Sequence, residues 1–220
     1  MSAMSSSAPS SPSPTQRLTD RKREAIIQAA VDEFLASGFA ATSMDRIAAR
    51  AEVSKRTVYN HFASKDELFA EILMHMLDCC AGDLEHPYRA DQPLHAQLLA
   101  LLESKLRMFE DARFLDFVRV AIAEAVHSPE RARAMIERIG EREEGVTAWI
   151  RAAQADGRLI DVDPAFAAMQ LQGLVKTFAF WPQIAFGQPT LTPAMQRQVA
   201  ESTAAMFLAH YAVRQEETSR

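Results

Sequence analysis

Residues 42–65 read TSMDRIAARAEVSKRTVYNHFASK, and this stretch decides the fold of the N-terminal part of the chain. Within it, residues 44–51 and 55–61 are each about two helical turns long, and their apolar residues follow helical spacing. A Ser or Thr stands directly before each segment, where a helix N-cap is expected. Two short helices joined by a turn of three or four residues form a helix-turn-helix. The stretch therefore predicts this motif.

Helical patterns continue on both sides of the motif. Among 220 residues, Gly occurs only 7 times and Ala 38 times, and Ala is the strongest helix former. Glycine is too sparse for a G-x-G-x-x-G or Walker A phosphate loop. We expect an all-α fold, an N-terminal three-helix helix-turn-helix head on a C-terminal helical bundle, with about nine helices. The expected helices span 20–37, 44–51, 55–61, 65–81, 92–110, 112–127, 129–156, 164–186 and 193–213, and glycines 140 and 145 are candidates for breaking the seventh.

The second helix of the motif carries polar and basic side chains on its outward face, namely Lys55, Arg56, Thr57, Tyr59 and Asn60. Such donors reach phosphates and base edges when a helix enters the major groove of DNA. By geometry Arg suits guanine and Asn suits adenine, but the sequence does not decide which of these side chains contact bases. The alternative is a pair of core-packing helices with a solvated charged face, which explains this cluster of residue types poorly.

The charge distribution fits the same interpretation. The net charge is −5, but residues 1–66 carry +2 and residues 67–220 carry −7. This difference has the sign expected of a DNA-binding head on an acidic body. Residues 1–16, rich in Ser and Pro, are expected to form a disordered tail. The longest apolar run has six residues, far fewer than the roughly 20 that span a membrane, so a soluble cytoplasmic protein is expected.

With these residues in view, residues 22–77 resemble the TetR (tetracycline-repressor-like) family of bacterial transcriptional regulators. The matching motifs are Ile27-x-x-Ala30-x-x-x-Phe34, Gly38-Phe39, Thr42-Ser43, Ile47-Ala48, Val53-Ser54, Thr57-x-Tyr59-x-His61-Phe62 and Ser64-Lys65-x-x-Leu68. The resemblance implies that residues 17–66 form the DNA-binding domain. It implies phosphate contacts by Thr42 and Ser43. It also implies groove contacts by Ser54, Lys55, Arg56 and Thr57, and backbone contacts by Tyr59, His61 and Lys65, besides the candidate Asn60.

Two positions depart from the family pattern. Glu52 stands in the turn where the family often has Gly, and Arg56 stands where it often has Gly. If the turn needs a positive φ, Glu52 costs about 1 kcal/mol of stability. Arg56 adds a charge to the outward face and is expected to alter base preference.

Residues 67–220 resemble, more distantly, the AefR-type C-terminal domain of TetR-like repressors. The resemblance rests on Glu124-Ala125, Ser128-Pro129, Gly157-Arg158-Leu159 and Asp163-Pro164, and it implies a ligand-binding and dimerisation domain. Candidate ligand contacts are the Met and aromatic residues Met108, Phe114, Phe117, Met135, Trp149, Phe178 and Trp181. Candidate residues for a homodimer interface are Phe178, Phe180, Trp181, Phe186, Met206, Phe207 and Tyr211, with the internal core as the alternative place for each.

We therefore expect a homodimeric DNA-binding transcriptional regulator. In this hypothesis it is a repressor that a small apolar or aromatic molecule releases from a palindromic double-stranded operator. No enzymatic activity, metal, cofactor or membrane partner is expected. The alternatives are an activator, a helical adaptor that does not bind DNA, and a di-iron carboxylate enzyme built on Glu124-x-x-His127. The adjacent Cys79 and Cys80 are expected to be packed side chains, with a redox sensor as the alternative.

Overall fold

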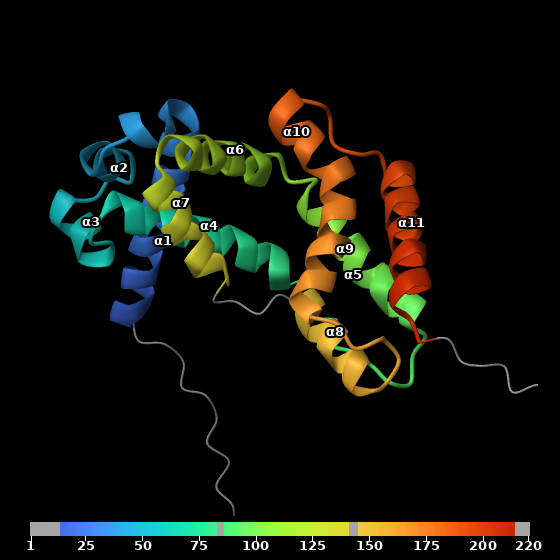
Figure 1. Ribbon diagram of the computed structural model, residues 1–220. Helices are drawn as coiled ribbons and strands as arrows, with labels where there is room; N and C mark the ends of the chain where they lie inside the picture. Colours follow the sequence, from blue (N-terminus) through green and yellow to red (C-terminus); the bar gives the residue numbers. More distant parts are fainter. Residues whose placement is uncertain (1–13, 83–85, 141–144, 214–220) are drawn as a thin grey trace, which may run out of the picture. The chain divides into compact units, whose positions relative to one another are not determined.

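The computed structural model describes residues 14–82, 86–140 and 145–213, which divide into two compact units at residues 72 and 73. In these ranges the regular elements are helices (Figure 1), apart from one isolated antiparallel bridge between Leu159 and Ala212. The expected all-α fold, with an N-terminal helix-turn-helix and a C-terminal helical bundle, is confirmed. In the same ranges, no helix combines the length and the hydropathy needed to cross a membrane.

Unit 1, residues 1–72, contains α1 (Pro14–Ala41), α2 (Met44–Arg50), α3 (Lys55–His61) and the first half of α4 (Lys65–Gly82). α1 begins at Pro14, inside the segment expected to be a tail, because proline is well suited to the first helical position. The rest of that segment, residues 1–13, lies outside the described part. α1 is kinked at Gly38, whose φ of 76° only glycine adopts at little cost. The kink falls where the helix was expected to end.

The core of unit 1 is aromatic. Phe34 of α1 stacks on Phe39, with ring centroids 5.7 Å apart, and Phe69 of α4 meets both rings edge-on at 5.0 Å. Val58 of α3 and Phe62, directly after it, are fully buried, so they hold one face of α3 against the unit. α2 packs against both α1 and α3. The helix-turn-helix is thus fixed by its inward face, which leaves its outward face to solvent.

Unit 2, residues 73–220, holds the remaining helices. They are α5 (Leu94–Met108), α6 (Ala112–His127), α7 (Pro129–Gly140), α8 (Gly145–Ala155), α9 (Pro164–Ala179), α10 (Trp181–Phe186) and α11 (Pro193–Tyr211). α5 packs along α11 and α9, α8 packs against α9, and α10 packs against α6 and α9. At the centre, Trp149 is buried and its Nε1 donates a hydrogen bond to Oε1 of Gln97 over 3.3 Å.

One of the long helices expected from the sequence is interrupted within the described residues. For the expected helix 129–156, the structure describes two helical parts, α7 to Gly140 and α8 from Gly145, and the four residues between them, where the break was predicted, lie outside the described part. The expectation of one continuous helix over 164–186 is wrong, because the backbone leaves helical geometry at Phe180, with φ −126° and ψ −62°. In a continuous helix Pro182 would supply no N–H and its ring would clash with the carbonyl of Phe178, which explains why α10 starts as a separate helix at Trp181.

Candidate nucleic-acid interface

The helix-turn-helix is built from two capped helices and a tight turn. Ser43 caps α2, since its hydroxyl accepts a hydrogen bond from the backbone N–H of Arg46 over 3.3 Å. Ser54 caps α3 in the same way by accepting the N–H of Thr57 over 3.0 Å. Between them, the N–H of Val53 donates to the carbonyl of Ala48 over 3.1 Å. Both serines were expected at DNA, and the structure places them at the exposed N-termini of their helices.

The outward face of α3 is polar, basic and accessible. Lys55, Arg56, Tyr59 and Asn60 are all exposed, and Tyr59 is 46% accessible to solvent although it is a large aromatic residue. The ammonium of Lys55 lies 6.0 Å from the centroid of the Tyr59 ring. The structure therefore brings these four predicted site residues together on one surface. Thr57 and His61 flank this surface and are half-buried.

An acidic side chain of α2 meets this basic surface. Asp45 accepts a charge-assisted hydrogen bond from Lys55, with 2.7 Å between Nζ and Oδ1. This hydrogen bond, and then the charge of Asp45, raise the pKa of Lys55, so Lys55 is cationic at neutral pH. Both side chains are exposed, so the pair adds little stability. Its larger effect is to place a negative charge where phosphates would approach.

We expect Asp45→Asn to strengthen DNA binding by about 2- to 10-fold at low salt, since it removes this negative charge and frees Lys55. Lys55 stays protonated in the variant because an ordinary lysine has a pKa of about 10.4. Fluorescence anisotropy with labelled duplex DNA measures the change. Asp32→Asn, which makes the same charge change on α1, is the control. Equal gains for both variants, or no gain for Asp45→Asn, would contradict a specific role for the Asp45–Lys55 pair.

The turn between α2 and α3 contains a strained residue. Glu52 has a φ of 55°, the left-handed conformation that residues other than glycine rarely adopt. This geometry satisfies the condition under which the sequence predicted a cost of about 1 kcal/mol at this position. The strain is local, because the residues on both sides keep the hydrogen bonds of the turn.

Replacing Glu52 with Gly is expected to stabilise the protein by about 0.5–1 kcal/mol, since Gly adopts this φ without strain but loses more chain entropy on folding. Urea denaturation of the full chain measures the change in the free energy of unfolding. Glu52→Gln serves as the control, because it removes the same charge and keeps the strain. A stabilisation of equal size in both variants would assign the effect to charge rather than to φ.

Two residues that were expected to contact phosphate have their polar groups engaged within unit 1. Thr42 is 2% exposed, and its single hydroxyl hydrogen is shared between the carbonyls of Gly38 (2.8 Å) and Glu33 (3.1 Å). The expectation of a phosphate contact by the Thr42 side chain is therefore corrected, because a buried and engaged hydroxyl does not reach DNA. Lys65 is half-buried, and its ammonium donates to the carbonyls of Phe39 (2.7 Å) and Thr42 (2.8 Å).

A second set of charged residues in unit 1 was missed by the sequence analysis. Glu33 of α1 is buried, and its carboxylate binds Arg50 Nε through Oε1 and Arg46 Nη2 through Oε2, both at 2.8 Å. The two arginines lie one turn apart on α2, so one carboxylate fixes α2 on α1. The available signal was a lone glutamate directly before Phe34 in the apolar stripe of α1, which is where a buried acid needs a cationic partner.

The expected effector contacts in unit 2 fall into two groups. Met108, Phe114, Phe117 and Trp149 are buried, whereas Met135 is half-buried. Phe178 and Trp181 are about half exposed. A chain of aromatic contacts joins α5 and α6 to α10: Phe109 lies 6.4 Å from Phe114 and 5.4 Å from Phe180, and Phe180 lies 5.0 Å from Trp181.

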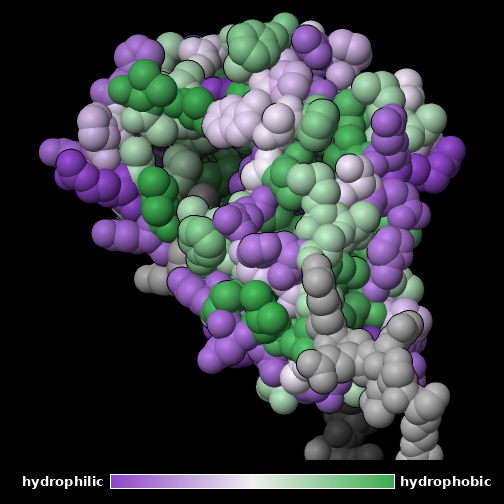
Figure 2. Space-filling model, turned by 45° about the vertical axis from the view of Figure 1, so that its right-hand side comes forward, coloured by the Kyte–Doolittle hydropathy of each residue, from purple (hydrophilic) through white to green (hydrophobic). Residues whose placement is uncertain are grey.

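The face formed by α9 and α11 exposes large apolar side chains. Figure 2, which turns the α9–α11 side of Figure 1 forward, shows apolar surface among polar residues there. The residues exposed on these two helices and on α10 include Phe166, Met169, Phe178, Trp181, Phe186, Met195 and Met206. Of the expected dimer residues, Phe207 and Tyr211 are instead buried in the internal core and Phe180 is half-buried. The sequence did not distinguish these two environments.

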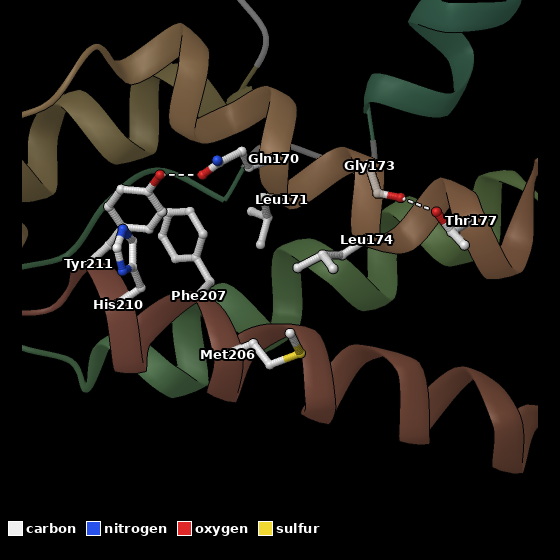
Figure 3. A pocket seen from close by; sticks show the side chains of 9 residues that line it. All are labelled: Gln170, Leu171, Gly173, Leu174, Thr177, Met206, Phe207, His210 and Tyr211. Carbon is white, nitrogen blue, oxygen red and sulfur yellow. Dashed lines mark hydrogen bonds between the residues drawn. The ribbon is translucent and has the colours of Figure 1, made fainter.

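An open hollow of about 480 Å³ lies on this face between α9 and α11. Figure 3 shows its two walls, with Gln170, Gly173 and Thr177 on α9 and with Met206 and His210 on α11. The hydroxyl of Tyr211 is hydrogen-bonded to Gln170, which links α11 to α9 beside the hollow. The hollow is a shallow, mixed polar and apolar surface between two helices.

The residues of the di-iron alternative are engaged elsewhere. Glu124 forms an ion pair with Arg131, and a ring nitrogen of His127 lies 2.6 Å from the carbonyl of Ala123. In the described ranges, no three His, Cys, Asp or Glu side chains are grouped to hold a metal ion. The side chains of Cys79 and Cys80 lie outside the described part of the structure.

The comparisons with known proteins agree with a helix-turn-helix followed by a C-terminal helical domain. The family model for "Bacterial regulatory proteins, tetR family" matches residues 26–72, and that for "AefR-like transcriptional repressor, C-terminal domain" matches residues 96–213. The second match alone covers more than half of the chain. These are the two regions on which the sequence resemblances rest, and both resemblances are confirmed.

Solved structures and curated relatives give the same result. A TetR family transcriptional regulator from Pseudomonas syringae pv. tomato str. DC3000 is 54% identical, with a TM-score of 0.77 over 89% of this chain and 99% of that one. A structure named Flavonoid-responsive Regulator FrrA is 31% identical, with a TM-score of 0.73 over 89% of this chain and 100% of that one. The HTH-type transcriptional regulator RutR of Escherichia coli (strain K12) is 26% identical over 76% of this chain and 79% of that protein.

Proposed function

The chain belongs to the TetR family of DNA-binding transcriptional regulators, and we propose that it acts as a homodimeric repressor released from its operator by a small aromatic molecule. The observation that carries the proposal is the outward face of α3. There Lys55, Arg56, Tyr59 and Asn60 are exposed together on a helix whose other face is buried. Such a helix fits the major groove, where its side chains contact phosphates and base edges. Ser43 and Ser54 contribute phosphate contacts beside it.

The proposed dimer forms through the face made by α9 and α11. Met206 is exposed on it and lines the hollow between the two helices, and Phe178 is exposed on α9. A face of this kind is stabilised when a second copy covers it. Two copies place two helix-turn-helix motifs on half-sites about 34–36 Å apart, which a roughly palindromic operator provides.

The proposed effector site lies at the aromatic contacts among α5, α6 and α10. Phe109, Phe114 and Phe180 make these contacts, Met108 precedes Phe109 in the chain and is buried, and aromatic and Met side chains suit a flat apolar ligand. The relative named a flavonoid-responsive regulator supports an aromatic effector for this chain. α4 runs from Lys65 to Gly82 and contributes residues to both units, so a ligand in unit 2 can act on unit 1 through it. Binding of the ligand then weakens binding of DNA, and the reverse, with a coupling free energy of typically about 1–3 kcal/mol.

Tyr59 gives the direct test of the DNA contact. We expect Tyr59→Ala to weaken operator binding by about 10-fold or more, because it removes both a ring and a hydroxyl from the exposed face of α3. Tyr59→Phe keeps the ring and separates the two contributions. The operator is recovered by selecting genomic fragments with the purified protein, and affinity is measured over a range of salt concentrations. Unchanged binding by Tyr59→Ala across the salt titration would reject this contact.

The repressor and effector roles need a separate experiment. Transcription from a template carrying the recovered operator is expected to fall when the protein is added and to recover when a flavonoid is added. Stimulation of transcription by the protein alone would instead make it an activator. Lack of any response to flavonoids would reject this class of effector and leave the DNA-binding role intact.

A further inference from the structure

Lys65, the first residue of α4, has an environment that its expected role as a phosphate contact does not explain. Its ammonium donates to the carbonyls of Phe39 and Thr42 over 2.7 and 2.8 Å, and the carbonyl of Ala40 lies 3.5 Å away. It also lies 4.3 Å from the centroid of the Phe39 ring, within cation–π distance. A lysine ammonium has three N–H groups, and here three carbonyls of one short segment surround it.

These carbonyls belong to residues 39–42, the end of α1 beyond its kink and the residue after it, which we call the α1–α2 connection. Beyond the kink at Gly38, the chain passes through Phe39 to Thr42 and reaches the N-cap of α2 at Ser43. The last carbonyls of a helix lack partners within the helix and carry partial negative charge. The hydroxyl of Thr42 donates a hydrogen bond to the carbonyl of Gly38. The ammonium of Lys65 donates to the carbonyls of Phe39 and Thr42. The connection is thus held from two sides.

The same end of α4 is also fixed by packing. One turn after Lys65, the ring of Phe69 meets the rings of Phe34 and Phe39 edge-on at 5.0 Å. The first turn of α4 and the α1–α2 connection therefore share polar contacts and an aromatic core. A movement of α4 must either carry the start of α2 with it or break the hydrogen bonds of Lys65.

We propose that Lys65 is a positioning residue, which holds the start of α2 against α4 from within the protein instead of contacting a DNA phosphate. DNA binding depends on it because the placement of α2 fixes the placement of α3. The proposal differs from a phosphate contact in a measurable way. Removing a phosphate contact lowers the dependence of log K on log [salt] by about 0.9 per contact, whereas removing a positioning residue leaves that slope unchanged.

The experiment compares wild type, Lys65→Met, Lys65→Arg and Lys55→Met as full-length chains. Met keeps the apolar stem of the side chain, and Arg keeps the charge but has a planar fork that does not fit three converging carbonyls. Lys55→Met removes an exposed cation of α3 and is the control for a phosphate contact. Hydrogen exchange is measured by mass spectrometry on peptides covering residues 38–48 without DNA. Binding to a random-sequence duplex of about 30 base pairs, long enough for two half-sites, is measured at several salt concentrations.

For Lys65→Met we expect about 10-fold faster exchange in residues 39–44 and about 10-fold weaker DNA binding, with the salt slope of the wild type. For Lys65→Arg we expect an exchange rate and a DNA affinity between those of the wild type and those of Lys65→Met. Lys55→Met should leave exchange unchanged and lower the slope by about two for a dimer. Unchanged exchange in Lys65→Met, or a slope reduced as in Lys55→Met, would overturn the proposal.

If Lys65→Met does not fold, the same two measurements on Lys65→Arg decide between the roles. Faster exchange with an unchanged slope supports positioning, and the reverse result overturns it. The exchange measurement needs no DNA, so it tests the role of Lys65 even if the wild type fails to bind the duplex. A failure of the proposed repressor function is thereby distinguished from a failure of the Lys65 proposal.

Discussion

Replacing Phe34 with Ala is expected to lower the free energy of unfolding of unit 1 by about 3–5 kcal/mol and to abolish DNA binding. Phe34 is fully buried, and its ring contacts both Phe39 and Phe69. The substitution leaves a cavity at the place where α1, the α1–α2 connection and α4 meet. Because a typical domain is stable by only about 5–15 kcal/mol, this loss removes a large part of the stability of a small three-helix unit.

Urea denaturation, followed by hydrogen exchange on unit 1 peptides, measures the effect of Phe34→Ala. Phe34→Leu is the matched control, because it keeps most of the apolar volume and is expected to cost only about 1–2 kcal/mol. We expect DNA binding to depend on the stability of unit 1, so Phe34→Leu should still bind DNA and Phe34→Ala should not. Equal stability of the wild type and Phe34→Ala would mean that this aromatic cluster does not hold unit 1 together.

Replacing Met206 with Glu is expected to convert the protein to a monomer and to weaken operator binding by at least about 100-fold. Met206 is 57% exposed within the chain and lies beside the hollow between α9 and α11. In the proposed dimer it becomes covered, and burying an unpaired carboxylate there costs several kcal/mol. A monomer then binds one half-site at a time and loses the gain in affinity that comes from linking two helix-turn-helix motifs.

Sedimentation equilibrium and DNA binding together measure the effect of Met206→Glu. Ile136→Glu is the control, since Ile136 is an exposed apolar residue of α7 outside the α9–α11 face and receives the same charge. Ile136→Glu should remain dimeric and bind DNA as the wild type does. A dimeric Met206→Glu variant with unchanged affinity would show that the α9–α11 face is not the dimer interface.

The sequence was sufficient for most of the fold because the helix boundaries carry local chemical signals. Ser43 and Ser54 cap α2 and α3 with their own hydroxyls, and Gly38 ends the regular part of α1 with a positive φ. Glu52 was identified as a departure from the pattern, and its positive φ shows why glycine suits that turn. These features depend on neighbours within a few residues, which a sequence displays directly.

Features that depend on distant residues were not predictable in the same way. Lys65 is polar and lies next to the motif, but its partners are carbonyls 23 and 26 residues earlier in the chain. Phe207 and Met206 are neighbours on α11, yet one is buried and the other exposed. Helical spacing shows that such residues lie on different faces, but only the packing of α11 on α5 and α9 decides which face is internal.

Salt-dependent binding of the wild-type protein to its selected genomic fragment tests the DNA-binding role of α3 most directly. We expect a defined, roughly palindromic sequence to be recovered, with log K falling linearly with log [salt] at about −0.9 for each phosphate that the two α3 surfaces and their flanking residues neutralise. The same protein should bind a shuffled sequence at least about 1000-fold more weakly. Recovery of no common sequence, together with binding that does not change with salt, would contradict the assignment of α3 as the DNA-contacting helix.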